Sequence, residues 1–145
     1  MEKTMKKELV NHLIDEAFKA QERAYAPYSK FKVGAALLTR EGNIYRGCNI
    51  ENAAYSPGNC AERTAIFKAV SQGETDFTGI AIVGNAKGVN RGAGEICSPC
   101  GVCRQVMAEF CDPEEFKIIL GIDTDNYEEY TLGELFPLGF GKEHL

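Results

Sequence analysis

Cys60-Ala61-Glu62 and Pro99-Cys100-Gly101-Val102-Cys103 are the two stretches that say most about the fold and chemistry of this chain. Together they supply three thiols and a carboxylate, which can hold a zinc ion and leave a proton carrier beside its open position. A structural zinc site is normally closed by four protein ligands, whereas a hydrolytic site keeps three and leaves the fourth position to water. The pattern therefore predicts chemistry on a bound water.

Other interpretations of the same cysteines remain open. Cys100 and Cys103 alone match the C-x-x-C spacing of a thioredoxin-like redox pair. With Cys97 they form the beginning of a bacterial iron-sulfur run, although the expected fourth cysteine and its proline do not follow. A closed zinc site with Cys97 as the fourth ligand would use the same sulfur atoms for stability alone. Glu62 favours the hydrolytic site, because a closed site needs no carboxylate so near a ligand.

Length and composition indicate a single globular domain over residues 1–145. Hydrophobic residues make up 44% of the chain and charged residues 26%, and no apolar run is long enough to cross a membrane. The net charge of −5 and the absence of a Lys/Arg cluster argue against nucleic-acid binding, because neutralised phosphates supply most of that affinity. We expect a small-molecule substrate instead.

The N-terminal segment Met1-Glu2-Lys3-Thr4-Met5-Lys6-Lys7-Glu8 has the charge of a signal peptide, but an interrupted apolar pattern follows it. We therefore expect a cytoplasmic protein. In that compartment six cysteines suit metal binding or catalysis better than disulfides. Cys48 and Cys111, outside the cluster, are interpreted as small buried hydrophobic residues.

The spacing of apolar residues predicts alternating helices and strands. An amphipathic helix is expected over residues 7–25, and Asn59 stands in the N-cap position of a second, from Cys60 to about Gln72. Ser98 and Pro99 are expected to cap and begin a third helix. Strands are expected at Val33–Thr39, Ile44–Asn49 (joined to the first by a hairpin turn), Gly79–Val83, Lys117–Ile122 and Tyr127–Thr131, with a loop over 84–96 and a short turn over 132–136. This order suggests an α/β architecture in which helices flank a sheet.

This assignment puts every proposed metal ligand at the beginning of a helix. Helix N-termini carry unpaired amide donors and a partial positive charge, so they stabilise a thiolate over a thiol. Cys100 and Cys103 lie three residues apart on nearly the same helix face, so both can bind one ion. Cys60 and Glu62 point to nearly opposite sides of the helix axis, which places the metal beyond the helix end.

Segments spread over the chain resemble the cytidine deaminases of the short-chain homotetrameric type. They are residues 27–36, 47–55, 59–65, 98–105 and 135–141, and they occur in the family's order. The resemblance implies a three-layer α/β/α fold with a central mixed five-stranded sheet. It also implies one zinc ion per subunit and a homotetramer whose neighbouring subunits complete each other's active sites.

The activity implied by this resemblance is zinc-dependent hydrolytic deamination of cytidine and 2′-deoxycytidine to uridine and 2′-deoxyuridine, with release of ammonia. In zinc-dependent nucleobase deaminases a glutamate beside the metal acts as general acid and base. The resemblance thus assigns catalysis to Glu62 and metal binding to Cys60, Cys100 and Cys103. Three thiolates overcompensate the charge of Zn²⁺, and Arg63 is expected to correct this by donating hydrogen bonds to ligand sulfurs.

Substrate contacts are assigned by the same resemblance. Asn49 and Glu51 correspond to the pair that holds the ribose 3′-hydroxyl, and Phe31 corresponds to the aromatic ring that stacks on the pyrimidine. Ala61 corresponds to a residue with main-chain contacts to the base, and Tyr55 to a contributor across the subunit interface. The apolar tail, residues 135–141, is compatible with burial between subunits.

Two further functions would use the same metal site. A deaminase of another cytosine compound, such as blasticidin S, would place the same chemistry behind a different rim, although Asn49-Ile50-Glu51-Asn52 and Arg63 favour a nucleoside. A non-catalytic zinc module would have no use for Glu62. A polynucleotide cytosine deaminase is disfavoured, because the acidic chain offers no basic groove to hold a strand.

Overall fold

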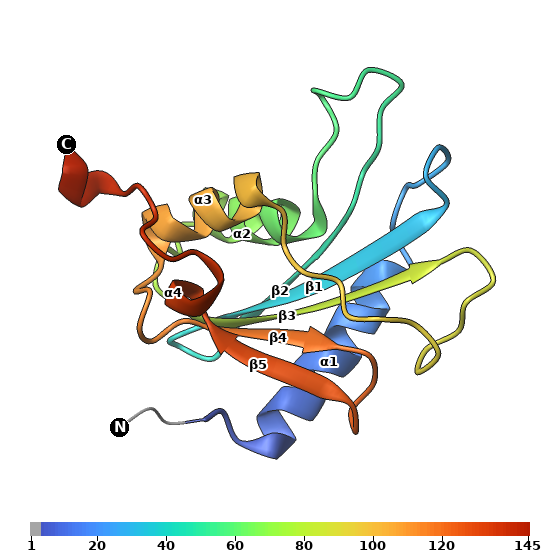
Figure 1. Cartoon of the computed structure of the whole chain (residues 1–145), viewed down its shortest axis with the longest axis horizontal. Coiled ribbons are helices and arrows are strands. Elements are labelled where there is room, and N and C mark those ends of the chain that lie inside the picture. Colours follow the sequence, from blue (N-terminus) through green and yellow to red (C-terminus); the bar gives the residue numbers. More distant parts are fainter. Residues whose placement is uncertain (1–3) are drawn as a thin grey trace.

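The computed structural model of this chain describes residues 4–145, so Met1, Glu2 and Lys3 of the N-terminal segment lie outside it. In this region five strands form one sheet in the order β2-β1-β3-β4-β5 (Figure 1). The strands are β1 Phe31–Thr39, β2 Ile44–Cys48, β3 Phe77–Ala86, β4 Lys117–Gly121 and β5 Tyr127–Thr131. β3 and β4 are parallel, whereas the other neighbouring pairs are antiparallel. The expected mixed five-stranded sheet is confirmed.

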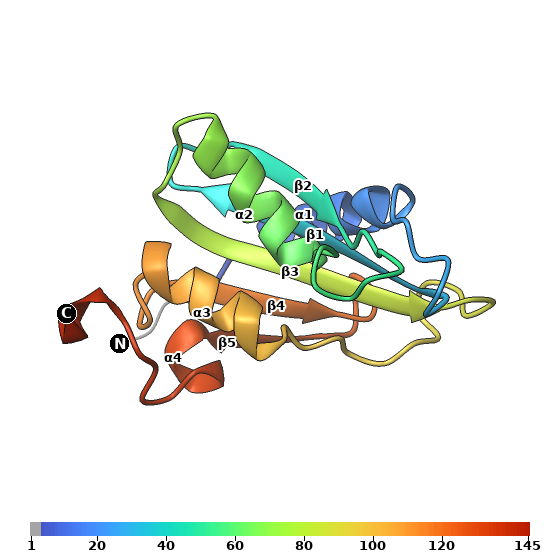
Figure 2. The same cartoon turned by 90° about the horizontal axis from the view of Figure 1, so that it is seen from above.

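Helices cover both faces of the sheet. α1 (Lys7–Gln21) lies on one face, and α2 (Ala61–Ser71) and α3 (Gly101–Phe110) lie side by side on the other (Figures 1 and 2). Successive side chains of a strand point to opposite faces. In β1, Ala36 and Leu38 accordingly pack in the core under α1, and Ala35 and Leu37 pack in the core under α2 and α3. The three-layer α/β/α architecture is confirmed.

Two predicted boundaries were wrong because distant backbone segments pair with each other. The first helix ends at Gln21, since Tyr25 leaves it to donate its amide to the carbonyl of Asn49 at 3.0 Å. β3 extends to Ala86, beyond the predicted end, because its last residues pair with Phe31, Lys32 and Val33 of β1. The predicted loop over residues 84–96 therefore begins later than expected.

The short turn expected over residues 132–136 is the helix α4 (Leu132–Leu135). Thr131 caps it: its hydroxyl accepts from the amide of Glu134 at 3.2 Å, and the Glu134 carboxylate accepts from the amide of Thr131 at 2.8 Å. The 3-10 turn η1 (Lys142–His144) follows. Within residues 4–145, none of the helices combines the length and the hydropathy that a bilayer span requires.

Gly47 of β2 allows α2 to lie unusually close to the sheet. A Cβ atom at this position would be 2.5 Å from the amide nitrogen of Ala65 and closer still to the carbonyl oxygen of Ala61. Both are backbone atoms of α2, which cannot rotate away as the end of a side chain can. The depth at which α2 packs, and with it the place of its first residues, therefore depends on a glycine here.

We predict that Gly47→Ala destabilises the protein by about 1–3 kcal/mol or more, because the added carbon must displace a packed helix. Urea unfolding followed by circular dichroism measures this loss. Gly101→Ala is the matched control, since a Cβ there meets nothing within 4 Å. Equal stability of the two variants would contradict the argument.

Candidate active site

Cysteines, and not the predicted Asn59 and Ser98, occupy the N-cap positions of the two helices at the site. Cys60 caps α2 and Cys100 caps α3, so Pro99 precedes the helix that it was predicted to begin. In the described chain neither sulfur accepts a hydrogen bond from the first amides of its helix. The two sulfur atoms instead lie 3.8 Å from each other.

The side chains of the two mispredicted caps are engaged elsewhere. The amide of Asn59 donates to the hydroxyl of Thr64 at 3.3 Å, and the hydroxyl of Ser98 accepts from the guanidinium of Arg104 at 2.6 Å. Each polar group therefore holds the approach to its helix in place.

The sulfur atoms of Cys60, Cys100 and Cys103 all lie within 4.8 Å of one another, as the spacing predicted. Thiolates that share a tetrahedral zinc at about 2.3 Å are about 3.8 Å apart, which is the distance between the sulfurs of Cys60 and Cys100. Three soft donors in this arrangement fit zinc. Cys97 is not a member of the group found in residues 4–145, so the closed four-cysteine site is not supported.

Hydrogen bonds and a neighbouring cation favour the thiolate form of Cys60. The thiol of Cys103 and the guanidinium of Arg63, whose Nη2 donates to Cys60 Sγ at 3.3 Å, lower the pKa of Cys60 to about 5. Although burial opposes it, hydrogen bonds to Cys60 and Cys103 raise the pKa of Arg63. Arg63 thus lies where the expected interaction with ligand sulfur requires it.

Glu62 stands in the first turn of α2, directly after Cys60 and Ala61, and is only 4% exposed. Burial raises the pKa of its carboxyl group to about 7. A buried carboxyl group beside a sulfur cluster can exchange protons with a bound reactant without competition from bulk water.

Cys60 and Cys100 of the cluster line a cavity of about 520 Å³, the size of a small-molecule site, whereas Cys103 is fully buried and does not line it. Most of the predicted residues line it together: Asn49, Glu51, Tyr55, Cys60, Ala61, Glu62, Arg63 and Cys100. Tyr55 lies at the cavity with 95% of its surface exposed. Residues that had been assigned no role also line the cavity, among them Ser29 and Cys97.

Phe31 is not among the described residues that line the cavity. Its ring lies across Gly84 of β3, where an added Cβ would be 2.7 Å from the ring and 2.9 Å from Cβ of Cys97. Phe31 is therefore a neighbour of a cavity residue. Its predicted stacking on a pyrimidine remains a prediction.

Two isolated backbone bridges at Ile50 place its neighbours Asn49 and Glu51 beside the sulfur cluster. Ile50 pairs with Tyr25 on one side and with Asn59 on the other, so the segment after β2 runs directly beside the residue that precedes Cys60. The amides of Ile50 and Asn59 each donate to the other's carbonyl at 2.9 Å. This pairing places residues on both sides of Ile50 at the cavity.

The carboxylate of Glu51 is held by a loop that the sequence did not connect with it. One oxygen accepts from the amides of Tyr28 and Ser29 at 3.0 Å each, and the other accepts from the hydroxyl of Ser29. Hydrogen bonds from Ser29 lower the pKa of Glu51. Ser29 lies in one of the segments that carry the resemblance, but no local pattern links it to a residue so far along the chain.

The amide of Asn49 is engaged with β1. Its nitrogen donates to the carbonyl of Phe31 and its oxygen accepts from the amide of Val33, both at 2.9 Å. One amide hydrogen is left for another acceptor. Asn49 therefore fixes the start of β1 against the cavity as well as lining it.

Residues 7–119 match the family described as "Cytidine and deoxycytidylate deaminase zinc-binding region". The chain belongs to this deaminase family. Zinc is its cofactor, which the group of three clustered thiols supports.

Relatives of this deaminase cover nearly its whole length. The cytidine deaminase of Sporosarcina psychrophila is 52% identical over 136 residues, 94% of either chain, and that of Halalkalibacterium halodurans is 50% identical over 133 residues, 92% of this chain and 95% of the relative. The crystal structure of cytidine deaminase from Burkholderia pseudomallei matches with a TM-score of 0.77 and 44% identity. It covers 89% of this chain and 97% of that one.

We predict that Arg63→Ala weakens zinc binding by about 10–100-fold, the usual cost of losing a group that hydrogen-bonds to a metal ligand. Competition with a chromogenic chelator measures the affinity. Arg63→Lys keeps the charge but loses the planar donor fork, so an intermediate affinity is expected. Wild-type affinity in Arg63→Ala would show that the contact with Cys60 does not act on the metal.

Proposed function

We propose that this chain is an enzyme that hydrolyses cytidine and 2′-deoxycytidine to uridine and 2′-deoxyuridine, with release of ammonia. One observation carries the proposal: a group of three thiols that fits zinc shares a cavity with the buried carboxyl group of Glu62. The names of the relatives support the choice of substrate. Neither a blasticidin S deaminase nor a structural zinc module is favoured by them.

When bound, zinc would act as a Lewis acid that lowers the pKa of water to about 7. Glu62 accepts a proton from a water as the oxygen of that water adds to C4 of the cytosine ring, and Glu62 delivers this proton to N3. Glu62 then takes the proton of the new C4 hydroxyl and transfers it to the departing amine as the C4–N4 bond breaks. The water oxygen remains on C4 and ammonia leaves, so atoms and charge balance.

The remaining proposed site residues bind the nucleoside. Glu51, already held by the loop at Ser29, accepts from the ribose 3′-hydroxyl, and Asn49 donates its free amide hydrogen to the same group. The main chain of Ala61 contacts the base, and Phe31, which lies beside the cavity residue Cys97, stacks on the pyrimidine. A carboxylate fixed before substrate arrives loses little entropy on binding.

We also propose that the enzyme is a cytoplasmic homotetramer with shared active sites. Three apolar side chains that line the cavity are exposed in the isolated chain: Tyr28 at 57%, Ile50 at 46% and Tyr55 at 95%. In the tail, Leu138 and Phe140 are also exposed. Apolar surface of this kind at the rim of a site is typical of a protein interface.

We predict that Glu62→Gln retains the fold and one zinc ion per chain but lowers kcat for cytidine by at least about a hundredfold, because the amide cannot carry the proton. Ammonia release measures turnover and metal analysis measures zinc. Glu109→Gln, an exposed change on α3, serves as the control. Metal-loaded wild-type protein that releases no ammonia from cytidine would reject the function itself.

The proposed assembly predicts a solution mass of four chains of 15.9 kDa each. Sedimentation equilibrium measures it directly. Tyr55→Ala should lower the activity without unfolding the chain, since the side chain is exposed until subunits associate. A mass of one chain at assay concentration, with full activity, would contradict shared sites.

A further inference from the structure

A second cavity, of about 630 Å³, lies where the end of α1, the strand β2 and the helix α2 meet. Four cationic side chains line it: Lys19, Arg23, Arg46 and Lys68. No described residue lines both this cavity and the one at the sulfur cluster. Four cations around one cavity are unexpected in a chain whose net charge is −5.

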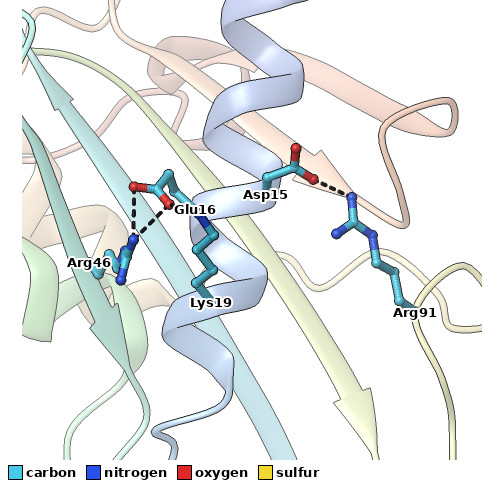
Figure 3. A network of polar contacts seen from close by, with 5 residues as sticks. All are labelled: Asp15, Glu16, Lys19, Arg46 and Arg91. Carbon is cyan, nitrogen blue, oxygen red and sulfur yellow. Dashed lines mark hydrogen bonds and ion pairs between the residues drawn. The ribbon is translucent and has the colours of Figure 1, made fainter.

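Carboxylates neutralise only part of this charge. Glu16 of α1 pairs with Arg46 at 2.8 Å and with Lys19 at 3.2 Å, so one carboxylate serves two cations (Figure 3). Although burial opposes it, these two neighbours lower the pKa of Glu16, which stays ionised. Glu22 also lines the cavity. Four cations and two carboxylates leave a surplus of two positive charges.

Arg23 and Lys68 carry part of this surplus, and Lys19 and Arg46, which share Glu16, carry the rest. Within residues 4–145, neither Arg23 nor Lys68 forms an ion pair. The ammonium of Lys68 donates one hydrogen bond to the carbonyl of Arg46 and keeps two protons for other acceptors. Arg23 is exposed and offers the planar donor fork that binds two oxygens at once. These are the donors that phosphate recognition uses.

The walls of the cavity are tied together before any ligand binds. Lys68 joins α2 to β2 through its bond to Arg46, and Arg46 joins β2 to α1 through Glu16. The hydroxyl of Thr64, which also lines the cavity, lies 3.0 Å from the carbonyl oxygen of Cys48. Lys19, Arg46 and Lys68 therefore surround one space from three secondary-structure elements, and Arg23 follows two residues after the end of α1.

We propose that this cavity binds a phosphate group, either free or as a phosphomonoester of a small metabolite. A phosphate monoester carries about −1.5 to −2 charges at neutral pH, which matches the surplus of two. The volume exceeds that of a phosphate alone and falls in the range of small-molecule sites, so the monoester has room for its organic part. The proposal does not depend on the deaminase function.

Isothermal titration calorimetry of the zinc-loaded protein tests the site, with inorganic phosphate, ribose 5-phosphate and ribose as probes. We expect saturable binding of one phosphate-bearing probe per chain and no binding of ribose. Tighter binding of ribose 5-phosphate identifies a monoester site, and equal affinity of both probes identifies a site for free phosphate.

Arg23→Ala and Lys68→Ala should each weaken this binding by at least about tenfold, because each removes a charged donor. Lys142→Ala removes the same charge from an exposed position outside the cavity and should bind as the wild type does. Zinc content and circular dichroism verify that the variants are folded. No saturable binding up to about 10 mM, or equal affinity in all three variants, would overturn the proposal.

Discussion

Two helices must begin at one point on the same face of the sheet for the sulfur atoms to meet. β2 and β3 are both antiparallel to β1, and β4 is parallel to β3, so the three strands run in one direction. α2 follows β2 and α3 follows β3 along the chain. Both helices therefore start at the edge where these strands end, which is where α/β proteins generally place their ligands. Cys60 and Cys100 are brought together by this topology.

The same edge of the sheet brings together thiols and a carboxyl group, whose burial would be unfavourable without partners. Burial removes a carboxyl group or a thiol from water and disfavours its charged form. For this reason the pKa values of Glu62 and Cys97 are both raised. The positive ends of two helices and the guanidinium of Arg63 offset this cost for the cluster. A metal ion completes the compensation, since it replaces thiol protons with a shared divalent charge.

α2 serves two sides of the molecule. Glu62 and Arg63, in its first turn, line the cavity at the sulfur cluster. Thr64 and Lys68, further along the helix, line the second cavity, where the four cationic side chains lie. The close approach allowed by Gly47 holds the helix against the strand between these two spaces.

Local patterns in the sequence were sufficient for the types and order of the five strands and the three long helices, but not for α4 and η1. Helical and strand periodicity in the apolar residues predicted the sheet and its flanking helices, because a buried face repeats at a characteristic spacing. Predicted element boundaries were wrong where a segment distant in the sequence pairs with the end of an element. Tyr25, for example, pairs with Ile50 and therefore does not continue the first helix. The predicted N-cap residues were wrong for a related reason, since the side chains of Asn59 and Ser98 hydrogen-bond to Thr64 and Arg104 instead of to the first helix amides.

The sequence by itself favoured a hydrolytic zinc site, because three thiols and a carboxylate at these spacings suit zinc and an activated water, but it left a closed zinc site and a redox pair open. Only the tertiary structure decided that Cys97 lies outside the sulfur group, that Phe31 packs on Gly84, and that Ser29 holds Glu51. It also gathered cations from three elements around one cavity. Such contacts join residues far apart in the chain, so they depend on how whole elements pack and not on local spacing.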